Sequence, residues 1–97
     1  METERWELIS FIMGSKHRRN LLLKLADKAP MTPTQISKML KVNISQTSRM
    51  LSEMVDKGLI LCRTPERKKF KIYQISEMGT HYIDEVKKLG LIGEVNG

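Results

Sequence analysis

Two helix starts stand close together in the middle of the chain, and their spacing limits how the chain can fold. Thr32-Pro33 is the first, because threonine is a good N-cap and proline is tolerated at the first helical position. Asn43 is the second, with a glutamine three residues later in an arrangement close to a capping box. A short helix over 33–41 must therefore end, and another over 44–57 must begin, within a few residues. We expect a tight turn between the two helices.

The segments around this pair predict three more helices and a hairpin. Gly58 suits the left-handed stop of the second helix, and beyond it strand-forming residues predict strands over 59–63 and 70–75. Apolar residues at helical spacing predict the further helices. These helices are 2–13, 16–28 and 77–89, the last with a stripe of Met78, Tyr82, Val86 and Leu89. The fold class is mainly α with a small β-hairpin (α+β), and the element order predicts a winged helix-turn-helix.

A length of 97 residues is that of one small domain. We expect residues 1–97 to form a single winged helix-turn-helix domain, with its core at 15–80. The terminal helices, 2–13 and 77–92, carry apolar side chains that so small a domain satisfies only in part. Pairing with a second copy would bury the rest, and the alternative is that both helices pack on their own domain. The side chains concerned are Trp6, Ile9, Met13, Tyr82, Val86, Leu89 and Ile92.

Positive charge is concentrated in the middle of the chain. Residues 16–71 hold 14 Lys/Arg and 4 Asp/Glu, a net of +10, whereas the two ends together hold 3 and 7, a net of −4. This asymmetry indicates one surface that faces a polyanion, and nucleic acid is the commonest polyanion for a small basic domain. The alternative is a charge excess that only keeps the protein in solution.

The predicted helix 44–57 has two chemically different sides when it is drawn at about 100° per residue. One side is an amphipathic stripe, predicted to be buried, of Thr47, Met50, Leu51, Met54 and Val55. The opposite side carries Ser45, Ser48, Arg49 and Ser52. Short hydroxyls let a helix approach DNA closely, and an arginine can bind guanine in a bidentate manner or clamp a phosphate. The alternative is a solvated surface that is rich in serine.

Two flanking residues complete the predicted DNA-binding set on these helices. Gln46 lies beside the serine side and can pair with adenine. Thr34 lies in the first turn of the preceding helix.

The predicted hairpin is the second basic element. Its cations lie within nine residues and are opposed by one glutamate; they are Arg63, Arg67, Lys68, Lys69 and Lys71. Such a wing, 63–71, would contact the phosphate backbone or enter the minor groove. The alternative is that lysines on a sheet edge prevent strand pairing, and both roles can hold together.

A third basic group opens the predicted helix 16–28. Cations at a helix N-terminus are mildly unfavourable, which indicates a contact elsewhere, such as one with a nucleic-acid backbone. The alternative is a solvated first turn, and the sequence does not decide between the two. The group consists of Lys16, His17, Arg18 and Arg19.

The segment from Thr32 to Gly79 resembles the winged helix-turn-helix of the MarR- and ArsR-type transcriptional regulators. The matching residues are Thr32, Gln35-Ile36-Ser37 to Leu40, Asn43, Ser48-Arg49, Leu51, Gly58-Leu59-Ile60 and Tyr73 to Gly79. The resemblance implies a homodimer that places its second motif helix in the major groove of double-stranded DNA. By position, the residues it turns toward DNA are Ile44, Ser45, Gln46, Ser48 and Arg49. It does not identify a small-molecule effector.

Several classes of function are excluded by what the sequence lacks. Cys62 is the one cysteine, which excludes an intrachain disulfide, a Cys-rich zinc site and the paired cysteines of ArsR-type metal sensors. No catalytic constellation or Gly-rich phosphate loop is present, so we expect no enzyme, no cofactor and no metal. No apolar run approaches the roughly 20 residues that span a bilayer, and no leader opens the chain, so we expect a cytoplasmic protein without membrane contact.

The sequence thus predicts a DNA-binding transcriptional regulator with 44–57 as its recognition helix. The alternative is a winged-helix module for protein–protein interaction within a larger assembly.

Overall fold

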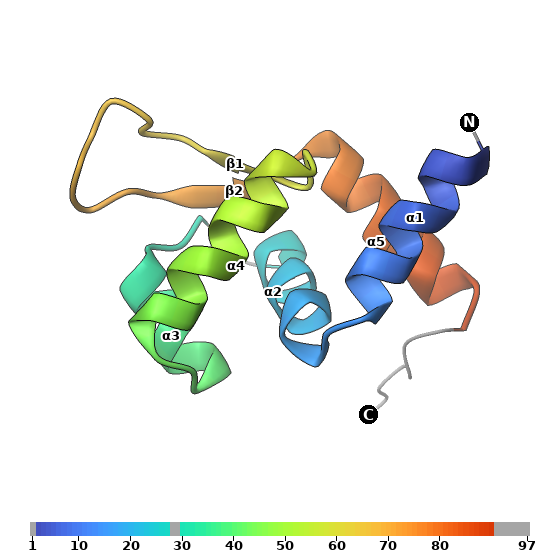
Figure 1. Ribbon diagram of the computed structural model, residues 1–97, viewed down its shortest axis with the longest axis horizontal. Coiled ribbons are helices and arrows are strands. Elements are labelled where there is room, and N and C mark those ends of the chain that lie inside the picture. The colour runs from blue at the N-terminus through green and yellow to red at the C-terminus, as the bar shows by residue number, and fades with distance from the viewer. Residues whose placement is uncertain (1, 28–29, 91–97) are drawn as a thin grey trace.

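The computed structural model describes residues 2–27 and 30–90. Its elements are α1 (Glu2–Met13), α2 (Lys16–Asp27), α3 (Pro33–Leu40), α4 (Ile44–Asp56), β1 (Ile60–Cys62), β2 (Tyr73–Ile75) and α5 (Glu77–Lys88). The predicted order of four helices, two strands and a last helix is confirmed, and the architecture is a winged helix-turn-helix (Figure 1). The predicted helix end at residue 28 and residues 91–92, including Ile92, lie outside the described residues.

Local hydrogen bonds account for the two helix starts and the turn between them. Thr32 forms a full capping box with Gln35, and the Asn43 side chain accepts a bond of 2.8 Å from the Gln46 amide. Lys41 closes α3 in the left-handed conformation, with φ 60°, and its N–H donates to the Ser37 carbonyl. The Ser37 hydroxyl donates to the Val42 carbonyl at 2.6 Å. The turn is therefore fixed at both ends by its own residues.

The hydrophobic core gathers around α2, which packs against α1, α3, α5 and β2. Its three buried leucines belong to a core cluster that also takes side chains from every other helix and from β1. The core consists of Ile9, Ile12, Leu21, Leu22, Leu25, Ile36, Leu40, Leu51, Met54, Leu59, Ile60, Ile83 and Val86. Burial of this set ties the helix-turn-helix to the terminal helices in one packed unit.

The hairpin is shorter than predicted. Strands β1 and β2 pair antiparallel over three residues each, with Ile60 opposite Ile75 and Cys62 opposite Tyr73, rather than over 59–63 and 70–75. One cause is that the Leu59 amide bonds back to the Met54 carbonyl at the end of α4. Within this pairing, Tyr73 of β2 lies opposite Cys62 of β1. Burial of the Tyr73 hydroxyl, and secondly its interaction with Cys62, raise the pKa of that hydroxyl. The residues between the strands are left as a long loop.

Helix α5 is rotated relative to its predicted stripe. Gly79, Ile83 and Val86 are buried and Tyr82 is half-buried against the core, whereas Met78 and Leu89 are exposed, so two of the four stripe residues do not share the buried face. The rotation follows from a close approach, because Gly79 lies against the carbonyl of Leu59. The Ser76 hydroxyl reinforces it by donating to the Gly58 carbonyl at 2.6 Å. Only a residue without a Cβ fits at that point of the helix.

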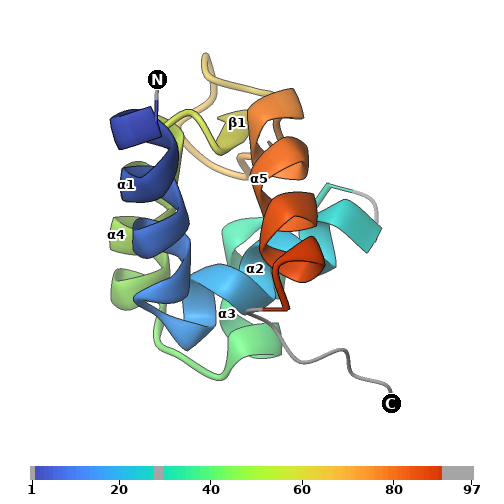
Figure 2. The same cartoon turned by 90° about the vertical axis from the view of Figure 1, so that its right-hand side faces the viewer.

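The terminal helices and the wing occupy different ends of the molecule. Helices α1 and α5 lie side by side at the end seen in Figure 2, where Arg5 Nε donates to Glu85 Oε1 at 2.8 Å. The wing loop and α3 lie at the other end of the longest axis (Figure 1), which measures 37 Å. A ligand at the wing end therefore leaves the outer faces of α1 and α5 free.

Gly79→Ala should destabilise the fold by roughly 3 kcal/mol, because the added methyl overlaps the Leu59 carbonyl and a strand side chain. Urea unfolding followed by circular dichroism measures the loss. Asp84→Ala, at an exposed position of the same helix, is the matched control and should change stability by less than about 0.5 kcal/mol. Equal stability of the two variants would contradict the close approach.

Candidate nucleic-acid interface

Helix α4 presents the predicted polar side to solvent. Thr47, Leu51 and Met54 are buried, and the Thr47 hydroxyl donates to the Asn43 carbonyl at 3.0 Å. Met50 is half-buried and Val55 is 38% exposed, so the predicted burial of Val55 was wrong. Val55 follows the buried Met54 in the last turn, and of the two only Met54 faces the core. The predicted DNA-facing residues on α3 and α4 are all exposed: Thr34, Ile44, Ser45, Gln46, Ser48, Arg49 and Ser52.

The two halves of α4 differ in charge. Its first turn holds no acidic residue, and its N-cap Asn43 and Arg49 are both exposed. Its acids, Glu53 and Asp56, lie in the second half. The unpaired amide groups of a helix N-terminus carry partial positive charge. An anion is therefore favoured at the N-terminal half of α4.

Most cations of the wing, residues 63–71, are exposed to solvent. Arg63, Arg67, Lys68 and Lys69 are exposed, whereas Lys71 is half-buried near the start of β2. The loop is ordered by its own polar groups, since the Ile72 amide donates to the Thr64 hydroxyl at 3.1 Å. Phe70 is 78% exposed at the wing and was not among the predicted site residues. An aromatic residue inside a run of cations was the signal that could have found it.

The arginines at the start of α2 contact the preceding helix. Arg18 Nη1 donates to the Phe11 carbonyl at 2.6 Å, and Arg19 Nη1 donates to the Met13 carbonyl at 2.7 Å. Helix α1 has no basic residue in its own last turn, so these arginines supply the positive charge that its C-terminus favours. A fully solvated first turn does not describe these two side chains, whereas a contact of this group with nucleic acid stays a prediction.

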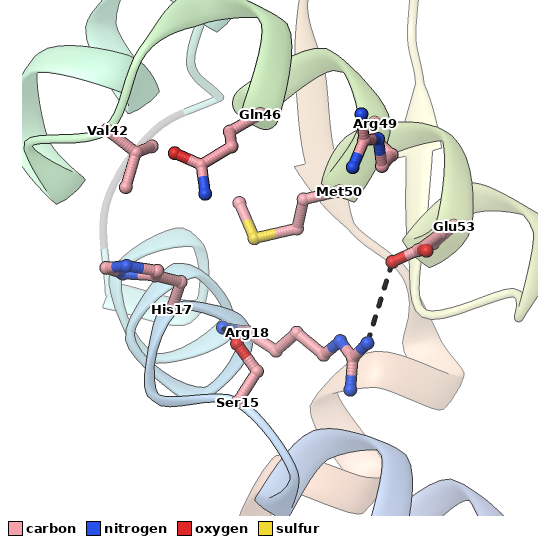
Figure 3. A pocket seen from close by; sticks show the side chains of 8 residues that line it. All are labelled: Ser15, His17, Arg18, Val42, Gln46, Arg49, Met50 and Glu53. Carbon is pink, nitrogen blue, oxygen red and sulfur yellow. Dashed lines mark hydrogen bonds and ion pairs between the residues drawn. The ribbon is translucent and has the colours of Figure 1, made fainter.

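Arg18 also connects α1 to the outer face of α4. Its guanidinium lies 3.8 Å from the centroid of the Phe11 ring and 3.6 Å from Glu53 Oε1. Figure 3 shows this ion pair at the rim of a hollow of about 150 Å³ between the start of α2 and α4. Gln46, Arg49 and Met50 line the α4 side of the hollow. One arginine thus braces the candidate recognition helix against the N-terminal helix.

The described part of the chain was also compared with the requirements of a metal site and of a membrane-spanning helix. Among residues 2–27 and 30–90, no group of three or more His, Cys, Asp and Glu is placed to hold a metal ion. None of the helices in these ranges has the length and apolar character needed to cross a bilayer.

The sequence profile of the MarR family matches residues 18–66, from the start of α2 into the wing, which is about half of the chain. The chain belongs to the MarR family. The MarR half of the resemblance stated above is thereby confirmed. A search of curated protein sequences gave no match.

Solved structures of MarR-family proteins share the fold. The MarR family transcription regulator SP03579 is 29% identical over 88% of this chain and 61% of its own, with a TM-score of 0.64. Apo MarR from E. coli is 19% identical over 91% of this chain and 69% of its own, with a TM-score of 0.70. A mutant MarR from E. coli complexed with operator DNA is 19% identical over 91% and 66%, with a TM-score of 0.69. This chain therefore spans less than two thirds of the length of SP03579.

Arg18→Ala should lower the free energy of unfolding by about 2 kcal/mol, because it leaves the Phe11 carbonyl without its charged donor and removes the contact with the Phe11 ring. Glu53→Gln removes only the longer, partly exposed ion pair and should cost less than about 0.5 kcal/mol. Urea denaturation of both variants measures the difference. If the two losses were the same size, the bond to α1 would not be the stabilising contact.

Proposed function

We propose that this MarR-family chain is a DNA-binding transcription regulator, folded as a single winged helix-turn-helix domain. In this proposal α4 enters the major groove and the wing, residues 63–71, lies on the phosphate backbone or in the minor groove. One observation carries it: the polar side of α4 with Arg49 is exposed, and Ile44 at the start of α4 lines one hollow with Lys69 and Phe70 of the exposed cationic wing. The complex of the E. coli MarR mutant with operator DNA supports this reading by family membership.

Each proposed contact follows from the chemistry of an exposed side chain. Arg49 would bind guanine O6 and N7 or a phosphate, and Gln46 would pair with adenine. Ser45, Ser48, Ser52 and Thr34 would donate to phosphates or base edges, as short hydroxyls do. Ile44, which is 49% exposed, would contact an apolar base edge such as a thymine methyl. The wing cations would supply affinity that is independent of sequence.

We further propose a homodimer that forms through the outer faces of α1 and α5. Ile9 and Val86, two of the apolar side chains that the terminal helices were expected to satisfy only in part, are buried in their own domain. Trp6 is 47% exposed and Leu89 is 45% exposed, and both lie on the two helices farthest from the wing. Pairing these faces would leave both copies of α4 open to DNA.

The proposal assigns no catalytic residue, metal or cofactor to the chain. It places the protein in the cytoplasm with the DNA that it would bind. The rival function, a module for protein–protein contact, has no observation of its own in its favour, and it becomes an outcome of the binding experiment.

The wild-type chain should bind a fluorescently labelled random-sequence duplex with steep salt dependence. Arg49→Ala should weaken binding to duplexes selected by the wild type roughly 10-fold or more and relax base preference. Lys68→Ala with Lys69→Ala should weaken all duplexes alike and reduce the salt slope by about 2. Fluorescence anisotropy at several salt concentrations gives both quantities.

Lys87→Ala is the control, because Lys87 is an exposed cation of α5 at the opposite end. It should leave affinity and salt slope unchanged. Absence of salt-dependent binding by the wild type would exclude the DNA function and favour the interaction module.

Trp6→Glu should convert a dimer to a monomer, because it introduces a charge into the proposed apolar interface. Sedimentation at micromolar concentration should show the wild type at twice its chain mass of 11.2 kDa and the variant at that mass. Leu61→Glu, at a β1 position that is 47% exposed and is not part of the proposed interface, should remain dimeric. A monomeric wild type would rule out the dimer.

A further inference from the structure

Phe70 is the most exposed large apolar side chain of the described residues. Its ring is 78% accessible to solvent, whereas the other exposed large hydrophobic residues lie between 38% and 49%. It stands at the end of the wing loop, directly after Lys68 and Lys69 and before Lys71. The core gains almost nothing from this ring.

The backbone at Phe70 is also costly. Its φ of 59° lies in the left-handed region, which bulky residues rarely adopt. The Phe70 carbonyl accepts from Arg67 Nη1 at 3.3 Å, and both residues are exposed, so this bond offsets little of the cost. A glycine or an asparagine would take the same conformation more readily. Stability of the free fold therefore does not explain a phenylalanine at this position.

The ring borders a hollow that separates the wing from the helix-turn-helix. This hollow of about 520 Å³ is lined by Thr32, Pro33, Thr34, Ile44, Lys69 and Phe70. Its walls combine two threonine side chains and an ammonium group with apolar surfaces, which suits a sugar–phosphate strand. A single strand of duplex DNA separates the major groove from the adjacent minor groove. A protein with a helix in one groove and a wing in the other needs such a channel for that strand.

Resting on the proposed DNA-binding function, we infer that Phe70 is an apolar wedge that enters the minor groove and opens a base step. With the strand in the channel and α4 in the major groove, the ring lies on the minor-groove side. Apolar side chains inserted there partly unstack adjacent base pairs and kink the duplex. Arg67, Lys68 and Lys69 hold the flanking phosphates while the ring is in place.

With this wedge, Phe70 determines sequence specificity through the ease with which a DNA base step deforms, and not through hydrogen bonds to base edges. Pyrimidine–purine steps such as TA unstack easily, whereas A-tracts are stiff. The minor groove presents almost the same donor and acceptor pattern in all A·T sequences. The protein should therefore prefer duplexes with a TA step under the wing, at a position that no side chain reads directly.

A basic loop with an exposed aromatic ring also resembles a membrane-binding element. That occupant fits less well, because burial in a bilayer surface needs a broad apolar face, and the residues beside Phe70 are lysines and an arginine. The channel between wing and helices likewise has no purpose on a lipid surface. Anionic vesicles are therefore included in the test.

The experiment compares the alternating duplex poly(dA–dT), which has a TA step at every second position, with the stiff homopolymer duplex poly(dA)·poly(dT). Anisotropy competition should show that the wild-type chain binds the alternating duplex roughly 10-fold more tightly. Phe70→Asn, which keeps the left-handed preference and loses the ring, should bring that ratio below about 2. Its salt slope should match the wild type, because no cation is removed.

Two further variants separate the ring from the charges. Phe70→Trp keeps an aromatic wedge and should retain the preference, whereas Lys68→Ala with Lys69→Ala should weaken both duplexes and keep their ratio. 2-Aminopurine in the TA step should brighten on binding of the wild type and not of Phe70→Asn. Urea unfolding of Phe70→Asn should give a midpoint equal to or above the wild type, which shows that the variant is folded.

Each contrary outcome points to a different failure. Salt-dependent binding to both duplexes with the same ratio in the wild type and Phe70→Asn would overturn the wedge and leave the DNA-binding function standing. No binding to either duplex would overturn the proposed function and the wedge with it. Binding to anionic vesicles that is lost in Phe70→Asn, without binding to DNA, would assign the ring to a membrane surface.

Discussion

The rotation of α4 about its own axis is the constraint on which the candidate interface depends. Thr47 sets it, because this side chain is fully buried and still donates its hydroxyl to the Asn43 carbonyl one turn earlier. A buried hydroxyl without a partner would cost free energy, so the bond lets a polar residue begin the buried stripe. Leu51 and Met54 continue the stripe, and the serine side with Arg49 is left outward. A rotation by about half a turn would exchange these faces.

Two groups of cations in the chain serve different purposes. Arg18 and Arg19 stand where α2 itself gains nothing from positive charge, and their guanidinium groups instead complete the C-terminus of α1. Arg49 and the wing cations Arg63, Arg67, Lys68 and Lys69 are exposed. A net positive charge counts all of these alike, whereas only the second group is available to a polyanion. Composition therefore overstates the cationic surface that the fold presents.

Sequence reasoning succeeded where a local signal determined the structure. The caps at Thr32 and Asn43 lie within a few residues of the amide groups they bind, so the helix starts could be predicted. The face of α5 could not, because its rotation depends on Gly79 meeting a carbonyl 20 residues earlier in the chain. The bonds of Arg18 and Arg19 to α1 were missed for a similar reason, since a turn between helices brings those groups together. The exposed side of α4 with Ser45, Ser48, Arg49 and Ser52 followed from periodicity, and the exposure of Phe70 did not.

Among the described residues, Lys41 and Phe70 are the two other than glycine with a left-handed backbone. Hydrogen bonds offset the cost of this conformation at Lys41 and do not offset it at Phe70. Lys41 closes α3, and the amide groups of Lys41 and Val42 both reach the Ser37 carbonyl, so its conformation terminates a helix and completes the turn. Phe70 ends an exposed loop and has no comparable set of bonds in the described residues. A strained backbone persists when something over-determines it. For Lys41 that is the helix end, and for Phe70 the remaining source of stabilisation is a ligand that meets its ring.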